Sequence, residues 1–251
     1  MLNEKTIKEN LKNDLEVFYF ETIDSTNTKA KELLKNGKQN DFVIVANEQT
    51  NGRGRQGKSF YSPNGTGIYM SVAFHPDMPL QNVVTATTAA SVAVCKAIEK
   101  LTDIKPKIKW VNDIYIGENK VCGILTESVT DVNYEIATGM VIGVGLNIKT
   151  TDFPKDILNA GSLGVDVDRA KLIATIADEI LEIALKDYSN FIDYYREHSM
   201  LLGKEIFYIE NGVKTFATAV SIDEKGGLVV KTEDGLKTLR SGEITVRQQE
   251  K

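Results

Sequence analysis

Histidine and cysteine are scarce in this chain, which has two of each among its 251 residues: His75, His198, Cys95 and Cys122. None of them has the close spacing that marks a zinc or iron–sulfur site. The two cysteines lie far apart, so we expect buried free thiols in a reducing cytoplasm rather than a disulfide. The sequence therefore predicts a cytoplasmic protein with no metal centre of its own.

Long apolar runs and an excess of positive charge are also lacking. No stretch approaches the roughly 20 apolar residues that span a bilayer, and residues 1–16 are too polar and charged for a secretory signal. The net charge of −5 argues against non-specific binding of nucleic acid by the whole chain. We therefore expect a globular protein that partners with neither membrane nor nucleic acid.

The hydrophobic content of 42% and charged content of 26% are ordinary for a globular chain, whose length suits one large domain and a small appendage. Helical periodicity and capping signals predict helices over residues 25–35, 82–101, 168–188 and 191–198. Apolar runs predict strands over 42–46, 68–74, 108–116, 121–128 and 134–148. These elements form a predicted domain over 1–202, of which 1–16 is a short N-terminal extension.

The pattern changes after residue 202. Short strand-like runs (IFYI, KTFATAVSI, LVVKT and ITV) are separated by Asn-Gly, Lys-Gly-Gly and Asp-Gly, which are strong hairpin signals. They predict a small SH3-like β-barrel over 203–251. The expected fold class is thus α+β: a mixed, largely antiparallel sheet flanked by helices, which we place on one side of it, followed by the barrel.

Residues 51–59, NGRGRQGKS, contain the formal G-x-x-x-x-G-K-S pattern of a phosphate-binding P-loop. A P-loop opens a helix whose first amides hold the phosphates. Here Pro63 and two glycines follow, and the next predicted element is a strand, so the context of a P-loop is missing. On this stretch alone, a solvated surface loop and an RNA contact through arginine and Phe60 both remain open.

Four stretches, taken in order and spacing, resemble the catalytic domain of the biotin protein ligases: DSTN (24–27), EQTNGRGRQG (48–57), KWVNDIYIGENKVCGI (109–124) and GVGLNI (143–148). The resemblance runs from about residue 17 to the C-terminus and includes SGEITVR near the end. It implies an enzyme that joins biotin and ATP into biotinoyl-5′-AMP and pyrophosphate. Biotin would then pass to one lysine of a biotin carboxyl carrier protein.

By this resemblance, the biotin site comprises Ser25, Thr26, Asn27, Gln49, Gly52, Arg53, Gly54, Arg55, Lys120, Gly123, Gly143 and Gly145. Four of them are neutral polar groups, which suits a ureido ring because an unmatched buried polar group costs about 1–3 kcal/mol. Without the other motifs, DSTN is better explained as a helix N-cap, and the two roles can coexist. Likewise, Gly143 and Gly145 fit either a close approach of the backbone to the ring or a simple β-bulge.

The resemblance assigns ATP and the adenylate to Arg53, Arg55, Lys58, Phe60, Lys109, Asn112, Lys120 and Asn147. The catalytic residues it implies are Lys120, Arg55 and Asp113. Lys120 would bridge the carboxylate and the phosphate, whose repulsion calls for fixed cations. Asp113 would deprotonate the incoming lysine or orient Lys120. Mg²⁺ is expected to arrive with ATP, because no carboxylate cluster marks a site for it.

The glycines of the loop are expected to let it close over the bound intermediate and exclude water, while its arginines order it around the negative charge. We expect 108–116 to be one strand, with residues 110, 112 and 114 on one face. The chain departs from the family pattern at Val111, where a proline is usual, and at Phe60, which often is tryptophan and here keeps the stacking face.

Two other functions remain open. A lipoate or octanoate ligase shares a related fold and one active-site lysine, but it needs a longer apolar slot and no ureido-matching cluster. A nucleic-acid-binding module would rest on the GRGR loop and the barrel, and would show salt-dependent affinity. Some relatives carry an N-terminal DNA-binding domain, which we do not expect in front of residue 17. A homodimer is left open.

Overall fold

The computed structural model describes residues 2–76, 78–79, 83–131, 136–185, 191–210, 212–240 and 245–248. Some expected features lie outside this part of the chain: residue 82 at the start of one helix, residues 134–135 of one strand, residues 186–188 at a helix end, Asn211 and residues 241–244.

A mixed sheet forms the centre of the molecule, with the strand order β1-β2-β3-β8-β7-β6-β5 and β4 paired to β8. Its strands are β1 (Glu16–Ile23), β2 (Phe42–Gln49), β3 (Gly67–Phe74), β4 (Met78–Pro79), β5 (Lys107–Lys109), β6 (Asp113–Ile116), β7 (Asn119–Asp131) and β8 (Ile136–Asn147). Only β1 and β2 run parallel among the paired strands described. The mixed, largely antiparallel sheet is confirmed.

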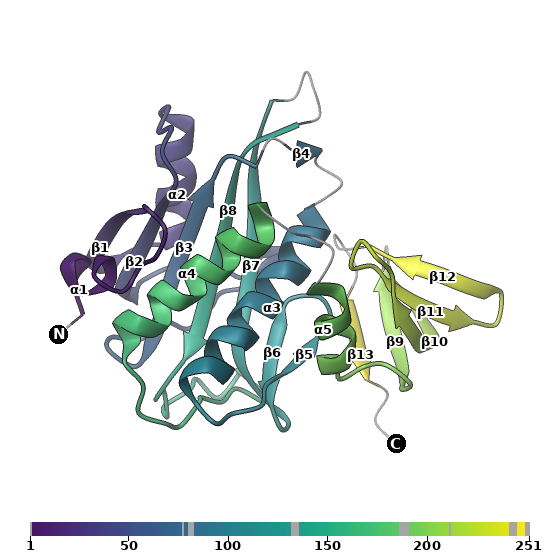
Figure 1. The fold of residues 1–251 in the computed structure, drawn as a ribbon. Coiled ribbons are helices and arrows are strands. Elements are labelled where there is room, and N and C mark those ends of the chain that lie inside the picture. The colour runs from purple at the N-terminus through teal and green to yellow at the C-terminus, as the bar shows by residue number, and fades with distance from the viewer. Residues whose placement is uncertain are drawn as a thin grey trace.

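The helices are α1 (Glu4–Lys8), α2 (Thr26–Lys35), α3 (Val83–Leu101), α4 (Arg169–Leu185) and α5 (Phe191–His198). In β2, Phe42 and Ile44 pack in a cluster with Ala30 and Leu34 of α2. The alternate residues of β2 point the other way, into the larger core that holds α3 and α4, which cross in front of the sheet in Figure 1. Helices therefore cover both faces, and the expectation that they lie on one side is wrong.

Strand β3 shows how cover by helices on both faces of the sheet affects the sequence pattern. All of its residues are buried, Ser71 included. A strand with one solvated face alternates apolar and polar residues, whereas a strand covered on both faces reads as a continuous apolar run. Residues 67–74 belong to the second kind, because α2 covers one face and α4 the other.

The expected single strand over 108–116 is wrong. It is a hairpin: β5 turns at residues 110–112 and returns as β6, with Lys109 opposite Asp113. The peptide bond between Trp110 and Val111 is cis. Trp110 and Val111 are both buried, so the apolar run does not distinguish a hairpin from one long strand. The predicted sharing of a face by residues 110, 112 and 114 fails with it.

The C-terminal part is an antiparallel sheet of β9 (Glu205–Glu210), β10 (Val213–Ile222), β11 (Leu228–Thr232), β12 (Gly235–Leu239) and β13 (Thr245–Gln248), in the order β12-β11-β10-β9-β13. This is the expected small β-domain, and the predicted boundary at 202 lies just before β9. Across the described residues, no helix has the length and apolar character needed to cross a bilayer.

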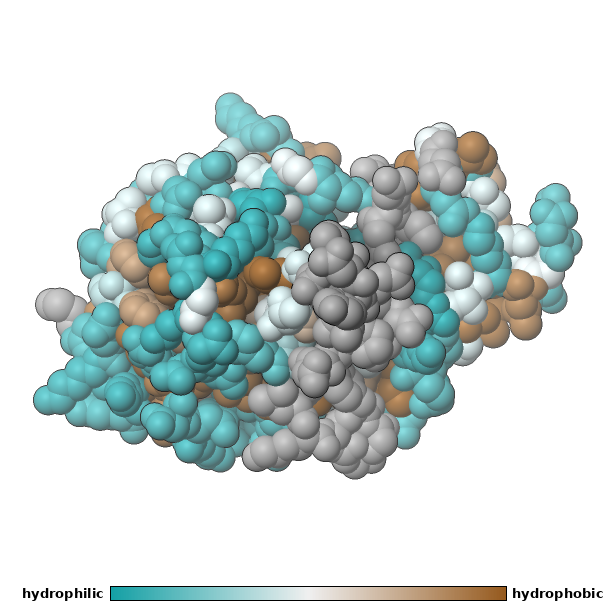
Figure 2. Space-filling view, turned by 90° about the horizontal axis from the view of Figure 1, so that it is seen from above, coloured by the Kyte–Doolittle hydropathy of each residue, from teal (hydrophilic) through white to brown (hydrophobic). Residues whose placement is uncertain are grey.

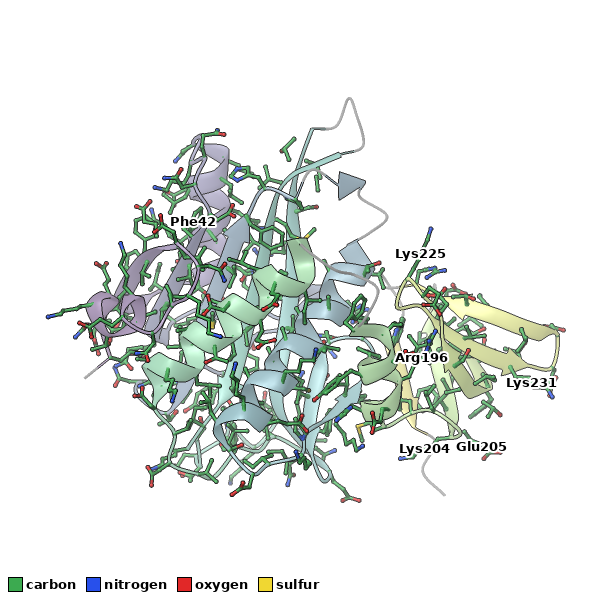
Figure 3. The ribbon with its side chains drawn as sticks, viewed as in Figure 1. Phe42, Arg196, Lys204, Glu205, Lys225 and Lys231 are labelled. Atoms are coloured by element: carbon green, nitrogen blue, oxygen red, sulfur yellow. The ribbon has the colours of Figure 1, made fainter. Side chains whose placement is uncertain are left out.

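The two parts share one hydrophobic core, to which the small sheet contributes Ile206, Leu228 and Val230. Polar contacts tie them as well. Arg196 of α5 points toward the small sheet (Figure 3), where its Nε donates to the Ile222 carbonyl at 2.8 Å. Brown surface appears at the right of Figure 2, where this sheet lies, and exposed apolar side chains there are Val213, Phe216, Val220 and Leu236.

Candidate active site

A cavity of about 1460 Å³ lies beside the glycine loop, between the N-terminus of α2, the ends of β2 and β8, and the β5–β6–β7 hairpins. Most of the predicted site residues line it: Ser25, Thr26, Asn27, Gln49, Arg53, Gly54, Arg55, Lys58, Phe60, Lys109, Asn112, Asp113, Lys120, Gly123, Gly143 and Gly145. Gly52 and Asn147 are buried and are not among its lining residues. The structure thus brings the four motifs together, while the role of each residue stays a prediction.

We call Ser25, Thr26, Asn27 and Gln49 the neutral end of the cavity. Ser25 is the N-cap of α2 and its hydroxyl accepts from the Thr28 amide, so the N-cap explanation is correct and compatible with lining the cavity. The amide and the hydroxyl of Thr26 both donate to Gln49 Oε1, at 2.9 and 3.1 Å. The side-chain nitrogen of Gln49 donates to Ser62 Oγ at 2.9 Å. These residues therefore fix one another's orientation.

Ser71 of β3 completes this network, although the sequence analysis did not single it out. Its hydroxyl lies 2.8 Å from Thr26 Oγ1 and 2.6 Å from Asn27 Oδ1. Ser71 is fully buried, and a buried hydroxyl needs such partners. A serine within an otherwise apolar strand was the only signal that could have identified it.

Two glycines of β8 make room for side chains of the site. A Cβ at Gly143 would lie 2.0 Å from Asn27 Oδ1, and one at Gly145 would lie 2.5 Å from the Phe60 ring. The pairing of β8 with β3 and β7 continues through both positions without interruption. The bulge alternative is therefore wrong, and close approach is the reason that glycine stands here.

The glycine loop is a tight hairpin. Arg53 forms a bridge with Ser59, the Gly54 amide donates to the Lys58 carbonyl at 2.7 Å, and the Phe60 amide donates to the Gly52 carbonyl at 2.8 Å. Its tip includes Gly57 with φ +73°, a conformation that favours glycine. After the loop, residues 60–66 lead through a turn into β3 and open no helix. The rejection of the P-loop is confirmed.

We call Arg53, Arg55 and Lys120, with Asp113 and Asn112, the cationic end. Lys120 Nζ lies 2.6 Å from Asp113 Oδ1 across the β6–β7 hairpin. This Oδ1 makes no hydrogen bond of suitable angle in the structure, so the contact is a close ion pair. Asp113 therefore holds the ammonium of Lys120 at the cavity wall.

Arg55 reaches the same wall from the loop, where its NH1 donates to Asn112 Oδ1 at 2.9 Å. Asn112 in turn donates to the Ile124 carbonyl at 2.9 Å, which fixes its amide. Burial lowers the pKa of Arg55 from its usual value, and the charge of Asp113 offsets part of this effect. A guanidinium keeps its charge at neutral pH despite such a shift.

The loop over residues 158–161 was not predicted to take part. Its Asn159 carbonyl accepts from the Lys120 amide at 2.7 Å, and the Gly161 amide donates to the Lys120 carbonyl at 2.9 Å. Asn147 donates to the Gly161 carbonyl of this loop at 2.9 Å, and its predicted contact with the nucleotide stays a prediction. Leu158, which lines the cavity, is 82% exposed.

Further lining residues that the sequence analysis missed are Tyr115, Glu118, Met200, Gly203, Lys204 and Glu205. The last three lie where the chain enters β9, and Figure 3 labels Lys204 and Glu205 there. No motif marks Gly203, Lys204 and Glu205, because they reach the cavity only through the packing of the small sheet. Among the described residues, no three His, Cys, Asp or Glu side chains form a group that could hold a metal ion.

Comparison with known proteins identifies the family of the chain. A sequence model of the biotin/lipoate A/B protein ligase family matches residues 19–147, and one of the biotin protein ligase C terminal domain matches 201–247. The bifunctional ligase/repressor BirA of Bacillus spizizenii is 32% identical over 261 residues, which cover 97% of this chain and 78% of that protein. The biotin–[acetyl-CoA-carboxylase] ligase of Mycobacterium tuberculosis is 27% identical over 214 residues, 80% of this chain and 77% of that one.

A solved structure of the biotin protein ligase from Aquifex aeolicus, in complex with biotin and ATP, superposes with a TM-score of 0.75 at 28% identity, over 93% of this chain and 99% of that one. The fold, the cavity and these sequence matches agree with one another, and the chain belongs to the biotin protein ligase family.

Proposed function

We propose that this protein is an ATP-dependent ligase that adenylates biotin and transfers it to a lysine of a biotin carboxyl carrier protein. The observation that carries this function is the meeting, in one cavity, of a buried neutral cluster with a set of held cations. A neutral ring with donors and an acceptor fits the first, and two reacting anions fit the second.

In the first half-reaction, a carboxylate oxygen of biotin attacks the α-phosphorus of ATP, which enters with Mg²⁺ as a substrate. The bond from that phosphorus to the bridging oxygen breaks, and pyrophosphate leaves. The two reacting groups are both anionic and repel each other. Lys120 and the loop arginines offset this repulsion at short range, where the partly buried site weakens solvent screening.

In the second half-reaction, the amine of the acceptor lysine attacks the acyl carbon, the bond to the phosphate oxygen breaks, and AMP leaves. The amine must lose a proton. The Asp113 carboxylate, which touches Lys120, is the group at the cationic end that suits this step. If the substrate anions draw Lys120 away, the carboxylate becomes free to accept the proton.

The glycine loop protects the mixed anhydride between the two steps. Arg53 and Arg55 lie on this loop, so binding of the adenylate by either side chain holds the loop over the cavity. Water excluded in this way cannot hydrolyse the intermediate. Both arginines stand at variable positions of the formal P-loop pattern, and they work through side-chain charge rather than helix amides.

Biotin is favoured over lipoate or octanoate by the neutral end. Thr26 and Asn27 are buried, Gln49 is half-buried, and all three are hydrogen-bonded. A purely apolar acyl tail could not offer these groups the donors and the acceptor that a ureido ring has. The acidic chain, with a net charge of −5, supports a ligase without a nucleic-acid partner. The buried thiols of Cys95 and Cys122 are unpaired, which suits a cytoplasmic location.

A sheet edge that a partner could use runs along β7. Among the described residues, β6 pairs with β7 only as far as Gly123, and residues 125–131 of β7 have a strand on one side only. We expect this edge to receive the carrier protein or a second copy of the chain. Sedimentation at two enzyme concentrations, with and without the carrier domain, separates the two. Without the carrier, only self-association makes the sedimentation coefficient rise with enzyme concentration.

The proposed function is tested by pyrophosphate release from ATP and Mg²⁺ with purified protein and one acid at a time: biotin, lipoate or octanoate. Release with biotin alone is the expected result, followed by biotinylation of an added carrier domain. Release with lipoate or octanoate instead would reverse the substrate. No release with any acid would reject the ligase.

A further inference from the structure

Glu127 of β7 lies at a junction of three elements just outside the cavity. Its Oε1 is 2.6 Å from Lys31 Nζ of α2 and 3.3 Å from Arg53 NH1 of the glycine loop. Its Oε2 accepts from Asn27 Nδ2 at 3.0 Å. The side chain is 17% exposed, so it is largely withdrawn from water. Glu127 lies outside the four sequence motifs.

The carboxylate of Glu127 is ionised at neutral pH. Burial alone would raise its pKa, but hydrogen bonds from Lys31 and Asn27, together with the charges of Lys31 and Arg53, outweigh burial and hold the pKa below its usual value. An ionised carboxylate accepts hydrogen bonds and cannot donate them. Whatever faces Glu127 must therefore be a donor.

This requirement fixes the orientation of the Asn27 amide. Its nitrogen faces two groups that only accept, Glu127 Oε2 and the Leu125 carbonyl at 3.2 Å. Rotating the amide by half a turn would set its oxygen against both of them. The observed orientation instead places Oδ1 next to the Ser71 hydroxyl, which can donate.

The fixed oxygen lies where a ligand would meet it. A Cβ at Gly143 would be 2.0 Å from Asn27 Oδ1, so this oxygen occupies the space that a side chain would fill on the cavity floor. Both Asn27 and Gly143 line the cavity. An amide oxygen in this place is an acceptor for a ring N–H.

We propose that Glu127 is a positioning residue for biotin specificity: it holds the Asn27 amide so that Oδ1, and not Nδ2, is offered to a ureido N–H of biotin. The inference rests on the proposed function, and it names the residue that sets the hydrogen-bond polarity of the neutral end. Glu127 acts through Asn27 and does not touch the substrate.

The simpler alternative is that Glu127 only joins α2 to β7 through Lys31. The two roles differ in what Lys31 contributes. If Glu127 is a structural tie, then Lys31→Met removes the same tie and matches the effect of Glu127→Gln. If Glu127 orients Asn27, then Lys31→Met leaves the orientation intact, because Glu127 Oε2 still accepts from Asn27.

The experiment measures the Kd of biotin by titration calorimetry, which needs no turnover, together with kcat for pyrophosphate release and the thermal midpoint. Glu127→Gln keeps the size of the side chain but can turn a donor toward Asn27. We expect its Kd to rise roughly tenfold, a factor typical of one lost hydrogen bond, with kcat within about twofold of the unchanged protein. Lys31→Met is expected to change the Kd less than about twofold.

A swapped pair gives the readout that a structural role would not produce. Asn27→Asp alone sets two carboxylates against each other, and its Kd should rise as well. In the double variant Asn27→Asp with Glu127→Gln, the amide introduced at position 127 donates to the carboxylate introduced at position 27. In either orientation, this carboxylate offers an oxygen to the cavity. The Kd should return to within about threefold of the unchanged protein.

An unaltered Kd in Glu127→Gln overturns the inference, as does an equal effect of Lys31→Met or a swapped pair no better than its single variants. If Glu127→Gln does not fold, the swapped pair and Lys31→Met still decide. An unchanged protein that binds no biotin would reject the proposed function itself, a result distinct from binding that ignores Glu127.

Discussion

The two ends of the cavity are built in opposite ways. At the neutral end, Thr26 and Asn27 are 3% and 4% exposed, and their polar groups are engaged with Gln49, Ser71 and Glu127. At the cationic end, the side chains of Lys120 and Arg53 are 34% and 42% exposed. The polar groups of one end are buried and hydrogen-bonded to one another, whereas the other end is more exposed and charged.

The difference follows from what each end has to bind. A neutral ring gains affinity only if its partners are already oriented, because each ordered side chain costs entropy on binding. Anions are attracted by charge even when the cations are partly exposed to water. The cations must not be left unpaired before the substrate arrives, and Asp113 and Glu127 neutralise them until then.

The comparison predicts that the largest effect comes from the cationic end. Lys120→Ala should lower kcat for pyrophosphate release by on the order of 10²–10³, because a fixed charge at the reacting groups is lost. Stopped assays with saturating biotin and ATP measure it. Lys149→Ala is the matched control, since Lys149 also pairs with an aspartate, Asp166, but lies away from the cavity. A comparable loss in the control would break the comparison.

At the neutral end, Thr26→Val should act on binding instead. The substitution keeps the shape but removes the hydroxyl that donates to Gln49 Oε1 and contacts Ser71. Loss of one such buried partner costs about 1–3 kcal/mol, so the Kd of biotin should rise roughly tenfold. Calorimetry measures the Kd. A fall in kcat at saturating biotin, with the Kd unchanged, would contradict the division of roles.

The small sheet is expected to support the cationic end only. Trp110, in the turn that carries Asn112, donates its indole N–H to the Gly226 carbonyl at 2.9 Å. A Cβ at Gly226 would lie 2.5 Å from Thr88 Oγ1. Gly226→Ala should therefore displace the Gly226 carbonyl and, with it, the turn at 110–112. We expect kcat to fall several-fold, with the Kd of biotin unchanged. Parallel kinetics and calorimetry measure the two quantities.

Gly212→Ala is the control for this prediction. Gly212 has φ +80°, close to the +81° of Gly226, but an added Cβ would meet nothing within 4 Å. Both variants carry the backbone cost of a left-handed alanine, about 1–2 kcal/mol. Only the Gly226 variant adds a clash. Equal effects of the two on kcat would show that the small sheet does not support the site.

The smallest effect concerns the glycine loop. Arg53 and Arg55 already have partners, Glu127 and Asn112, so the loop is a folded hairpin before any ligand binds. Biotin with ATP should slow proteolytic cleavage within 51–60 by only a few-fold, because part of the order is present beforehand. Timed digestion measures it. Cleavage at an unchanged rate would argue against closure of the loop over the intermediate.

Local patterns predicted the elements whose signals are local. Helix α2 carries its own cap at Ser25 and its own stop at Gly37, whose amide and that of Lys38 bond back to the Leu34 and Leu33 carbonyls. The motif residues were assigned by resemblance, and the cavity gathers nearly all of them.

What failed depends on contacts across the chain. The hairpin at 110–112 looked like a strand because its residues are buried by the small sheet and α5, which no local pattern reveals. In the sequence, Glu127 is a single charge on a predicted strand. Its partners Asn27, Lys31 and Arg53 lie about 75 to 100 residues earlier in the chain, so no local pattern connects them to it. Packing of helices on both faces of the sheet is likewise a tertiary property.

The central claim is that the neutral end binds and the cationic end reacts. The most direct test uses one variant, Lys120→Ala. The Kd of biotin is measured in the absence of ATP, and the rate of adenylation is measured in its presence. The account predicts a Kd within about threefold of the unchanged protein, together with a rate lower by on the order of 10²–10³. A Kd weakened by as large a factor as the rate would contradict it, because Lys120 would then hold the substrate rather than stabilise the reaction.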